Sequence, residues 1–214
     1  LTSITGTLDD GTGNDTIALT LAKTGVDISG ADTTTVTTIT GSAASANTAY
    51  AAVILSDTTL AAATLNALND NTTGAINANT VTTLTGTAAD ANTTFAAGKD
   101  GHITNLGNEA VTLSDTSLAT ATLNTLNDNT TGAVDATKLM TITGSAAHVN
   151  TAYTAGRAGE IIGLGNEAVT LDDSSLMAAT LNTLDGNTTG AVDATTLMTI
   201  TGSAAHVNTA YTAG

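Results

Sequence analysis

Aspartates are the residues of this sequence whose side chains are best suited to holding a metal ion. Asp57, Asp115 and the adjacent pair Asp172 and Asp173 follow short apolar runs at corresponding places in a repeated pattern. Carboxylate oxygens are the ligands that Ca²⁺ prefers, so these residues would form a calcium site if the fold clustered them. Aspartate is equally at home beside a helix N-terminus, where it accepts hydrogen bonds from backbone N–H groups. We favour the capping role and keep calcium binding as the alternative.

A second candidate calcium segment lies near the start of the sequence. Asp10–Ile17 reads DGTGNDTI and resembles one copy of the glycine- and aspartate-rich nonapeptide of RTX calcium-binding proteins. In that family, consecutive turns each supply half of the calcium ligands, whereas here Asp10 replaces the first glycine and no second copy follows. The resemblance implies that Asp10 and Asp15 are calcium ligands. The alternative is a surface loop.

Asparagine recurs in three series at fixed positions of the repeat. An asparagine amide can both donate and accept hydrogen bonds, so in stacked repeats these side chains would satisfy backbone groups of the neighbouring layer. We interpret the series as a structural polar ladder rather than as a ligand-binding site. Its members are Asn47, Asn92, Asn150 and Asn208; Asn66, Asn124 and Asn182; and Asn71, Asn129 and Asn187.

No combination of residues indicates an active site. His148 and His206 occupy the same position of successive repeats, where earlier repeats carry Ser45 and Asp90, and a catalytic base would not be exchanged so freely. We expect both histidines to be exposed on helices. Nucleophile elbows, phosphate-binding glycine loops and HExxH zinc motifs do not occur. We therefore predict that the chain is not an enzyme.

The composition limits the core that must position these residues. Hydrophobic residues make up 41% of the 214 residues, but they include one phenylalanine, three tyrosines and no tryptophan. Small aliphatic side chains suit shallow repeated layers better than one deep core. The formal net charge of −15 makes nucleic acid and anionic membrane poor partners, and the absence of cysteine removes disulfides and zinc–thiolate sites. No apolar run is long enough to span a membrane.

Internal repetition is the strongest pattern in the sequence. Residues 111–156 return almost unchanged as residues 169–214, with differences at only seven of the 46 paired positions. A linker block, GKDGHITNLGNEA at 98–110, returns as GRAGEIIGLGNEA at 156–168. We divide the chain into a divergent repeat or RTX-like turn segment, 1–33, and a tandem-repeat region, 34–214, with units at about 53–110, 111–168 and 169–214.

Each unit is predicted to contain two halves of roughly 29 residues, each with a strand followed by a helix. In the first half, Val111–Leu113 is β-prone, and Ser114–Ser117 supplies N-cap residues for a helix from Leu118 to about Leu126. Gly132 would provide the left-handed conformation that ends this helix. The residues expected on its inner face are Leu118, Ala121, Thr122 and Leu126.

In the second half, Leu139–Thr143 alternates like a strand, and Ser145 is expected to cap a helix from Ala146 to about Ala155. The inner face of this helix would be Val149, Ala152 and Tyr153. Strands separated by helices at constant spacing imply parallel pairing. We predict an α/β repeat solenoid with short parallel strands and short helices, two strand–helix coils per 58-residue repeat. The alternative is an all-β solenoid, because threonine runs such as Thr33–Thr40 favour strands.

The repeats also resemble a known group of proteins. The phrases VTTLTGTAADANT, NTTGAVDAT and LGNEAVTLSDTSLA are similar to the tandem repeats of very large, acidic, cysteine-free surface proteins of marine cyanobacteria, which are grouped with RTX-type secreted proteins. The resemblance covers roughly residues 34–214. It implies type I-like export and residence at the cell surface or in extracellular fibres. The scarcity of the nonapeptide departs from the RTX pattern and weakens the expectation of extensive calcium binding.

The function expected from these patterns is structural. Near-identical repeats that reach Gly214 without a polar cap would leave an apolar edge uncovered. We expect a segment of an extracellular bacterial surface fibre, filament or matrix protein, whose partner is another copy or a continued repeat. The alternative is an adhesin-type module that presents threonine and asparagine arrays to a glycan, a cell or ice. No cofactor is required, and Ca²⁺ would stiffen either form by offsetting repulsion between carboxylates.

Overall fold

The computed structural model describes residues 26–27, 38–41, 46–47 and 52–213. Most of the predicted RTX-like segment, including Asp10 and Asp15, lies outside the described residues. The chain divides into two compact units, residues 1–110 and 111–214. The division falls where two of the predicted repeat units meet.

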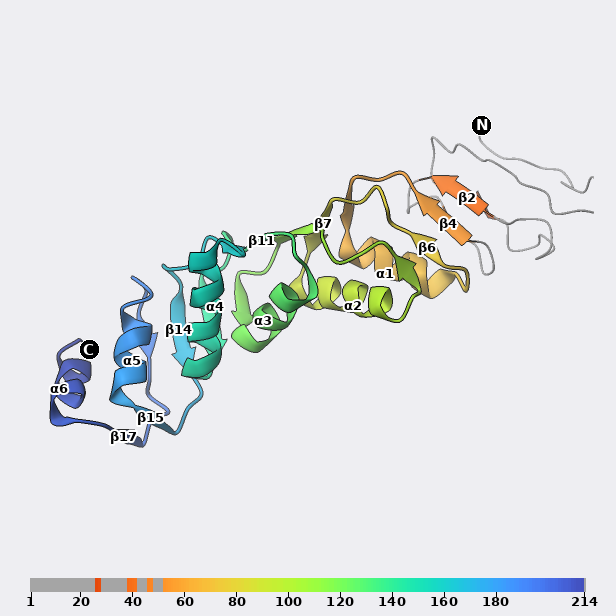
Figure 1. The fold of residues 1–214 in the computed structure, drawn as a ribbon. Helices are drawn as coiled ribbons and strands as arrows, with labels where there is room; N and C mark the ends of the chain where they lie inside the picture. Colours follow the sequence, from red (N-terminus) through yellow and green to blue (C-terminus); the bar gives the residue numbers. More distant parts are fainter. Residues whose placement is uncertain (1–25, 28–37, 42–45, 48–51, 214) are drawn as a thin grey trace, which may run out of the picture. The chain divides into compact units, whose positions relative to one another are not determined.

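The first unit combines parallel strand pairs with two helices that pack against each other (Figure 1). Its four-stranded sheet has the order β2 (Thr38–Gly41), β4 (Ala52–Leu55), β6 (Ile76–Asn77), β8 (Ile103–Thr104). The two further parallel pairs are β1 (Val26–Asp27) with β3 (Ala46–Asn47), and β5 (Thr59–Ala61) with β7 (Thr83–Gly86). The helices are α1 (Ala62–Asn71) and α2 (Ala88–Lys99).

The second unit repeats this plan with four helices, each in contact with the next along the chain. One group of parallel strands is β9 (Ala110–Leu113), β11 (Val134–Asp135) and β13 (Ile161–Ile162). A second is β10 (Ser117–Ala119), β12 (Thr141–Gly144), β14 (Ala168–Leu171) and β16 (Val192–Asp193), and the last pair is β15 (Ser175–Met177) with β17 (Thr199–Thr201). The helices are α3 (Thr120–Asn129), α4 (Ala146–Ala158), α5 (Ala178–Asp185) and α6 (Ala204–Ala213).

The α/β class predicted from the sequence is confirmed. The described part of the chain contains six helices, and every strand pair assigned in it is parallel. The all-β alternative is therefore wrong for these residues. The same part of the chain contains no helix with the length and apolar character needed to cross a membrane.

The second half of the repeat folds as its sequence predicts. The Ser145 hydroxyl accepts a hydrogen bond from the His148 N–H at 3.3 Å, which is the N-cap interaction of α4. Val149, Ala152 and Tyr153 are all buried, as the helical period requires. Gly159, in the left-handed conformation with φ 80°, ends the helix.

The first half of the repeat differs from the prediction in two respects. A short strand, β10, occupies Ser117–Ala119, so α3 begins at Thr120 rather than at Leu118, and its N-cap Ala119 makes no side-chain hydrogen bond. The buried face is consequently Thr120, Leu123 and Leu126, whereas Ala121 is exposed. The predicted cap was wrong because β10 pairs with β12, and that backbone pairing outweighs the local capping preference of serine.

The end of this helix was also predicted incorrectly. Thr130 follows α3 in the extended conformation, with φ −134° and ψ 149°, and Gly132 is not among the glycines with positive φ. Instead, the Gly132 N–H donates to the Thr130 hydroxyl at 3.0 Å. Gly74 with Thr72 and Gly190 with Thr188 make the same bond, so a threonine turn, not a left-handed glycine, redirects the chain after the helix.

The strand register shows which residues lie on top of one another. Val111 pairs with Val134, and Val134 pairs in turn with Ile161. We call each helix with the short strands before it a half-repeat. Val134 follows its strand partner Val111 by 23 residues, and Ile161 follows Val134 by 27 residues, so both offsets are shorter than half of the predicted 58-residue repeat. The linker block adds an extra strand, β13, so Val111 and its copy Val169 belong to different sheets.

Candidate functional site: the uncovered C-terminal half-repeat

The predicted metal ligands are used in part to stabilise a helix terminus. The Asp173 carboxylate accepts a hydrogen bond at 2.7 Å from the N–H of Ala146, the first residue of α4. The capped helix precedes Asp173 in the chain, so the bond links two half-repeats rather than starting the helix that follows. Asp172 is exposed, and Asp57 and Asp115 also have interaction partners.

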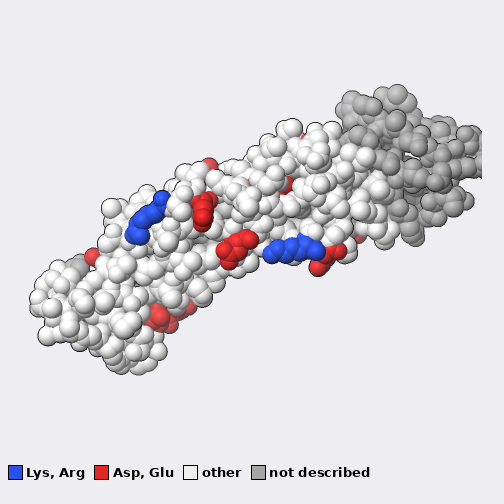
Figure 2. All heavy atoms as spheres, viewed as in Figure 1, with Lys and Arg blue, Asp and Glu red and all other residues white. Residues whose placement is uncertain are grey.

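No group of three or more histidine, cysteine, aspartate or glutamate side chains able to hold a metal ion lies within the described residues. On the face drawn in Figure 2, charged side chains are sparse and most of the surface is uncharged. Calcium binding therefore stays a prediction, and Asp10 and Asp15 lie outside the described part of the chain.

One asparagine series joins neighbouring helices. The side-chain amides of Asn66, Asn124 and Asn182 donate to the backbone carbonyls of Asp90, His148 and His206, at 3.0, 3.0 and 3.1 Å. Each acceptor lies on the next helix along the chain. These bonds link each half-repeat to a backbone carbonyl of the next one. The asparagines of the series therefore do not have to contact one another to connect neighbouring half-repeats.

A further hydrogen bond joins asparagines that belong to two different series. The amide of Asn187 donates to the Asn150 side-chain oxygen at 2.8 Å, and Arg157 donates to the Asn187 side-chain oxygen. Asn71 and Asn208 are exposed, Asn92 and Asn129 have further partners, and no side chain is described for Asn47.

In the series Asn66, Asn124 and Asn182, the side-chain oxygen has a hydrogen-bond partner only where the next helix supplies a threonine. In the first unit, the Thr94 hydroxyl donates to the side-chain oxygen of Asn66 at 2.7 Å. The residue in this position of the later repeats is alanine, Ala152 or Ala210. The side-chain oxygens of Asn124 and Asn182 are correspondingly buried without a hydrogen-bond partner.

The two histidines are exposed on α4 and α6, as expected. Sequence reasoning missed a different ionisable group, the glutamate of the linker block. Glu109 and Glu167 are both 0% exposed. The recurring GNEA at the end of each linker, with a carboxylate next to an apolar strand, was the available signal.

Glu167 is held between its own loop and helix α4. One carboxylate oxygen accepts hydrogen bonds from the Gly165 N–H at 2.8 Å and from the Tyr153 hydroxyl at 3.3 Å, while the other is buried without a hydrogen-bond partner. Burial, together with the adjacent Glu167, raises the pKa of Tyr153 to about 12, because a phenolate would be poorly solvated and close to a carboxylate.

The last half-repeat has the same sequence as a buried one but is uncovered. Residues 139–156 and 197–214 are identical, yet Tyr153 is 3% exposed and its counterpart Tyr211 is 74% exposed. Val207 and Ala210 are likewise more open than Val149 and Ala152. Identical residues therefore differ in burial, because Tyr153 is covered by the half-repeat that contains Glu167 and Tyr211 has no such neighbour among the described residues.

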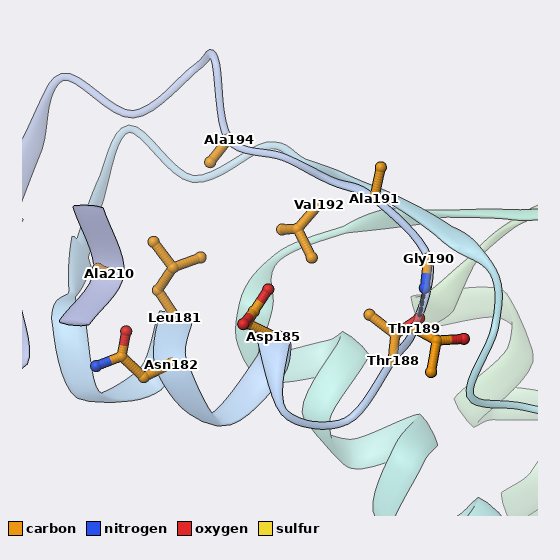
Figure 3. Close-up of a pocket in the computed structure, with 10 residues that line it drawn as sticks. All are labelled: Leu181, Asn182, Asp185, Thr188, Thr189, Gly190, Ala191, Val192, Ala194 and Ala210. Atoms are coloured by element: carbon orange, nitrogen blue, oxygen red, sulfur yellow. Dashed lines mark hydrogen bonds between the residues drawn. The ribbon is translucent and has the colours of Figure 1, made fainter. Parts of the chain in front are cut away.

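A pocket of about 630 Å³ opens on this uncovered side. Figure 3 shows side chains of α5, of the loop 188–194 and of α6 around it. Its apolar lining includes Leu181, Val192 and Ala210. The counterparts in the preceding repeat, Leu123, Val134 and Ala152, are all fully buried. The pocket is therefore the position that a following half-repeat fills elsewhere in this unit.

Searches of protein-family models, of curated protein sequences and of solved structures find no match to the chain.

Proposed function

We propose that the chain is a structural segment of an extracellular bacterial surface fibre, filament or matrix protein, and that its half-repeats stack as the coils of a solenoid. The observation that carries this proposal is the parallel pairing of each half-repeat with the next, as in Val111 with Val134 and Val134 with Ile161. Tyr153 of one half-repeat and Glu167 of the next are both buried and share a hydrogen bond, which is the behaviour of units that are stable when stacked.

The energetic logic supports the stacking part of the proposal. A single half-repeat has only a thin aliphatic layer, formed in α3 by Thr120, Leu123 and Leu126, and this layer loses contact with water only when a neighbour covers it. Main-chain hydrogen bonds between successive strands and the asparagine bonds between successive helices add polar links in the same direction.

The extracellular assignment rests on other features. A cysteine-free chain with net charge −15 needs neither disulfides nor a reducing compartment, and its repeats resemble those of secreted surface proteins. A structural role also requires no group of reacting side chains.

The threonines give less support to the adhesin alternative. On the exposed helix faces, Thr93, Thr125 and Thr151 donate their hydroxyl hydrogens to carbonyls four residues earlier in their own helices. Helix packing and local hydrogen bonding therefore account for these residues without an external ligand.

The direct test is electron microscopy of purified protein together with variants in which residues 111–168 are duplicated once or twice. Stacking predicts elongated rods whose length increases by the same amount with each inserted repeat, and fibrils if rods join end to end. Compact particles whose long dimension does not change with repeat number would contradict the proposal. Antibodies against the chain should label the outer surface of the bacterium, and purely internal labelling would contradict the extracellular part.

Calcium is tested by thermal unfolding with Ca²⁺, with Mg²⁺ and with a chelator. If Ca²⁺ acts only by reducing carboxylate repulsion, both ions should raise Tm similarly, by about a few degrees. A rise specific to Ca²⁺ would instead indicate a dedicated site, and replacing Asp10 and Asp15 with asparagine would show whether the first segment supplies it.

A further inference from the structure

We propose that Met140 and Met177 are surface oxidation sites, whose thioethers reduce hydrogen peroxide to water while the repeat stays folded. Both side chains are largely exposed, Met140 to 64% and Met177 to 61%. The product at each site is methionine sulfoxide, which methionine sulfoxide reductases convert back to methionine. This chemical property of the repeats goes beyond the structural role and does not depend on it.

Methionine is the only side chain of this sequence that reacts readily with peroxide. The sequence contains three methionines and neither cysteine nor tryptophan, so no thiol or indole competes for the oxidant. Met140 and Met177 belong to the half-repeats of α4 and α5, and each of these helices packs against a helix on both sides. Their exposure is therefore a property of covered, interior half-repeats.

Packing does not account for a methionine at either position. Met140 lies directly before β12, where the first unit has the exposed Thr82, and Met177 ends β15, where the preceding copy has the exposed Ala119. Methionine usually fills irregular gaps in a core. Because threonine or alanine occupies the same surface place in another copy, the thioether is not needed to fill space here.

The same comparison shows that the fold accommodates a polar group at the first of these sites. The Met140 N–H donates to the Thr116 carbonyl at 2.9 Å, and the Thr82 N–H makes the equivalent bond to Thr58, also at 2.9 Å. The backbone is thus paired in the same way beside a thioether and beside a hydroxyl. A sulfoxide oxygen is a hydrogen-bond acceptor, and at an exposed site water satisfies it without the cost of burying a polar group.

The reaction needs no catalytic group from the protein. The sulfur lone pair attacks one peroxide oxygen, the O–O bond breaks, and the other oxygen leaves as water after taking up the proton of the transferred oxygen. Sulfur is oxidised by two electrons and peroxide is reduced by two. Access of peroxide to the sulfur therefore sets the rate, and the exposed fraction of the side chain is the relevant structural quantity.

The test is treatment of the full chain with hydrogen peroxide, followed by peptide mapping with mass spectrometry. It uses the variant Met198→Thr, which removes the third methionine and copies the threonine of the first unit. We expect one oxygen on Met140 and one on Met177, at rates within about tenfold of that of methionine in a short unstructured peptide. Circular dichroism should be unchanged, and Tm should fall by less than about 5 °C, as for substitutions of exposed residues. Methionine sulfoxide reductases of both epimer specificities, with dithiothreitol as the reductant, should remove both oxygens.

A buried thioether in the same unit is the matched control. Leu123 of α3 is fully buried, and Leu123→Met is a volume-conserving exchange of the kind that cores tolerate. The introduced methionine should oxidise at least about tenfold more slowly than Met140, because peroxide reaches it only when the unit opens. Met140→Thr should remove one of the two added oxygens and leave the circular dichroism unchanged.

Three results would overturn the proposal. A rate at Met140 or Met177 more than about tenfold below that of the short peptide would mean that the thioether is covered. A fall in Tm of more than about 5 °C on oxidation would mean that the repeat does not tolerate the sulfoxide. Oxidation of the buried control methionine at the rate of Met140 would mean that the reaction proceeds through unfolding. Rods that lengthen with repeat number would still support the structural role in each case, so the two failures are distinguishable.

Discussion

Two half-repeats of the second unit have nearly the same sequence and different environments. The one containing α4 has neighbours on both sides and buries Tyr153, while the one containing α6 has a neighbour on one side and exposes Tyr211. Their local structures nevertheless agree, since each has a helix that starts after a serine accepting an N–H bond from the histidine three residues later. The comparison separates what the local sequence determines from what the next layer contributes.

Truncating the tyrosine should give the largest contrast. Tyr153→Ala removes a buried aromatic ring and should lower the free energy of unfolding of this unit by about 3–5 kcal/mol. Tyr211→Ala changes an exposed residue and should cost about 0.5 kcal/mol or less. Urea unfolding followed by circular dichroism measures both, and equal losses would mean that the two faces are covered to the same extent.

Titration of the same residue should show its burial directly. In a variant with Tyr50→Phe and Tyr211→Phe, the tyrosinate absorbance should rise with a midpoint near the pKa of about 12 raised by burial. Because this pKa lies above the unfolded value of about 10, the stability that the neutral phenol contributes is complete below pH ~10 and is lost as pH rises toward 12. A midpoint near 10 in a chain that is still folded would contradict the burial of Tyr153.

A smaller effect should distinguish the two units through their asparagines. Thr94→Ala leaves the Asn66 side-chain oxygen without the Thr94 hydroxyl and should destabilise the first unit by about 1–3 kcal/mol. Ala152→Thr supplies a hydroxyl to the unsatisfied Asn124 oxygen and should stabilise the second unit by about 1 kcal/mol. Thermal unfolding measures both changes, and destabilisation by Ala152→Thr would show that the added methyl and hydroxyl do not fit.

The smallest effect is expected for the carboxyl pKa values of two aspartates that occupy equivalent positions of the repeat. Hydrogen bonds from the N–H and hydroxyl of Thr137 lower the pKa of Asp135, and Thr195 lowers the pKa of Asp193 in the same way. The stabilisation is therefore present above the unfolded pKa and is lost as pH falls through the folded value. Carboxyl titration by NMR should give lowered pKa values for both residues, and an ordinary value for Asp193 alone would mean that this turn needs a covering layer.

The sequence predicted those features that depend on local chemistry. Ser145 as a cap and the inner face of α4 follow from capping preference and helical period, and both are confirmed. The start of α3 could not be predicted in this way, because Ser117 and Leu118 form a strand only when β12 lies alongside. The recurring GNEA marks Glu167, but it does not show that Tyr153 of the preceding helix is the residue that contacts its carboxylate.

The extra strand in the linker means that duplicating the sequence does not simply translate the structure. Thr112 and its copy Thr170 lie on strands of two different sheets of the second unit. Within one of these sheets, a given repeat residue is therefore not aligned with its copy in the next repeat. Gene duplication can lengthen such a chain and bury more aliphatic surface without building a regular array of identical side chains along one side.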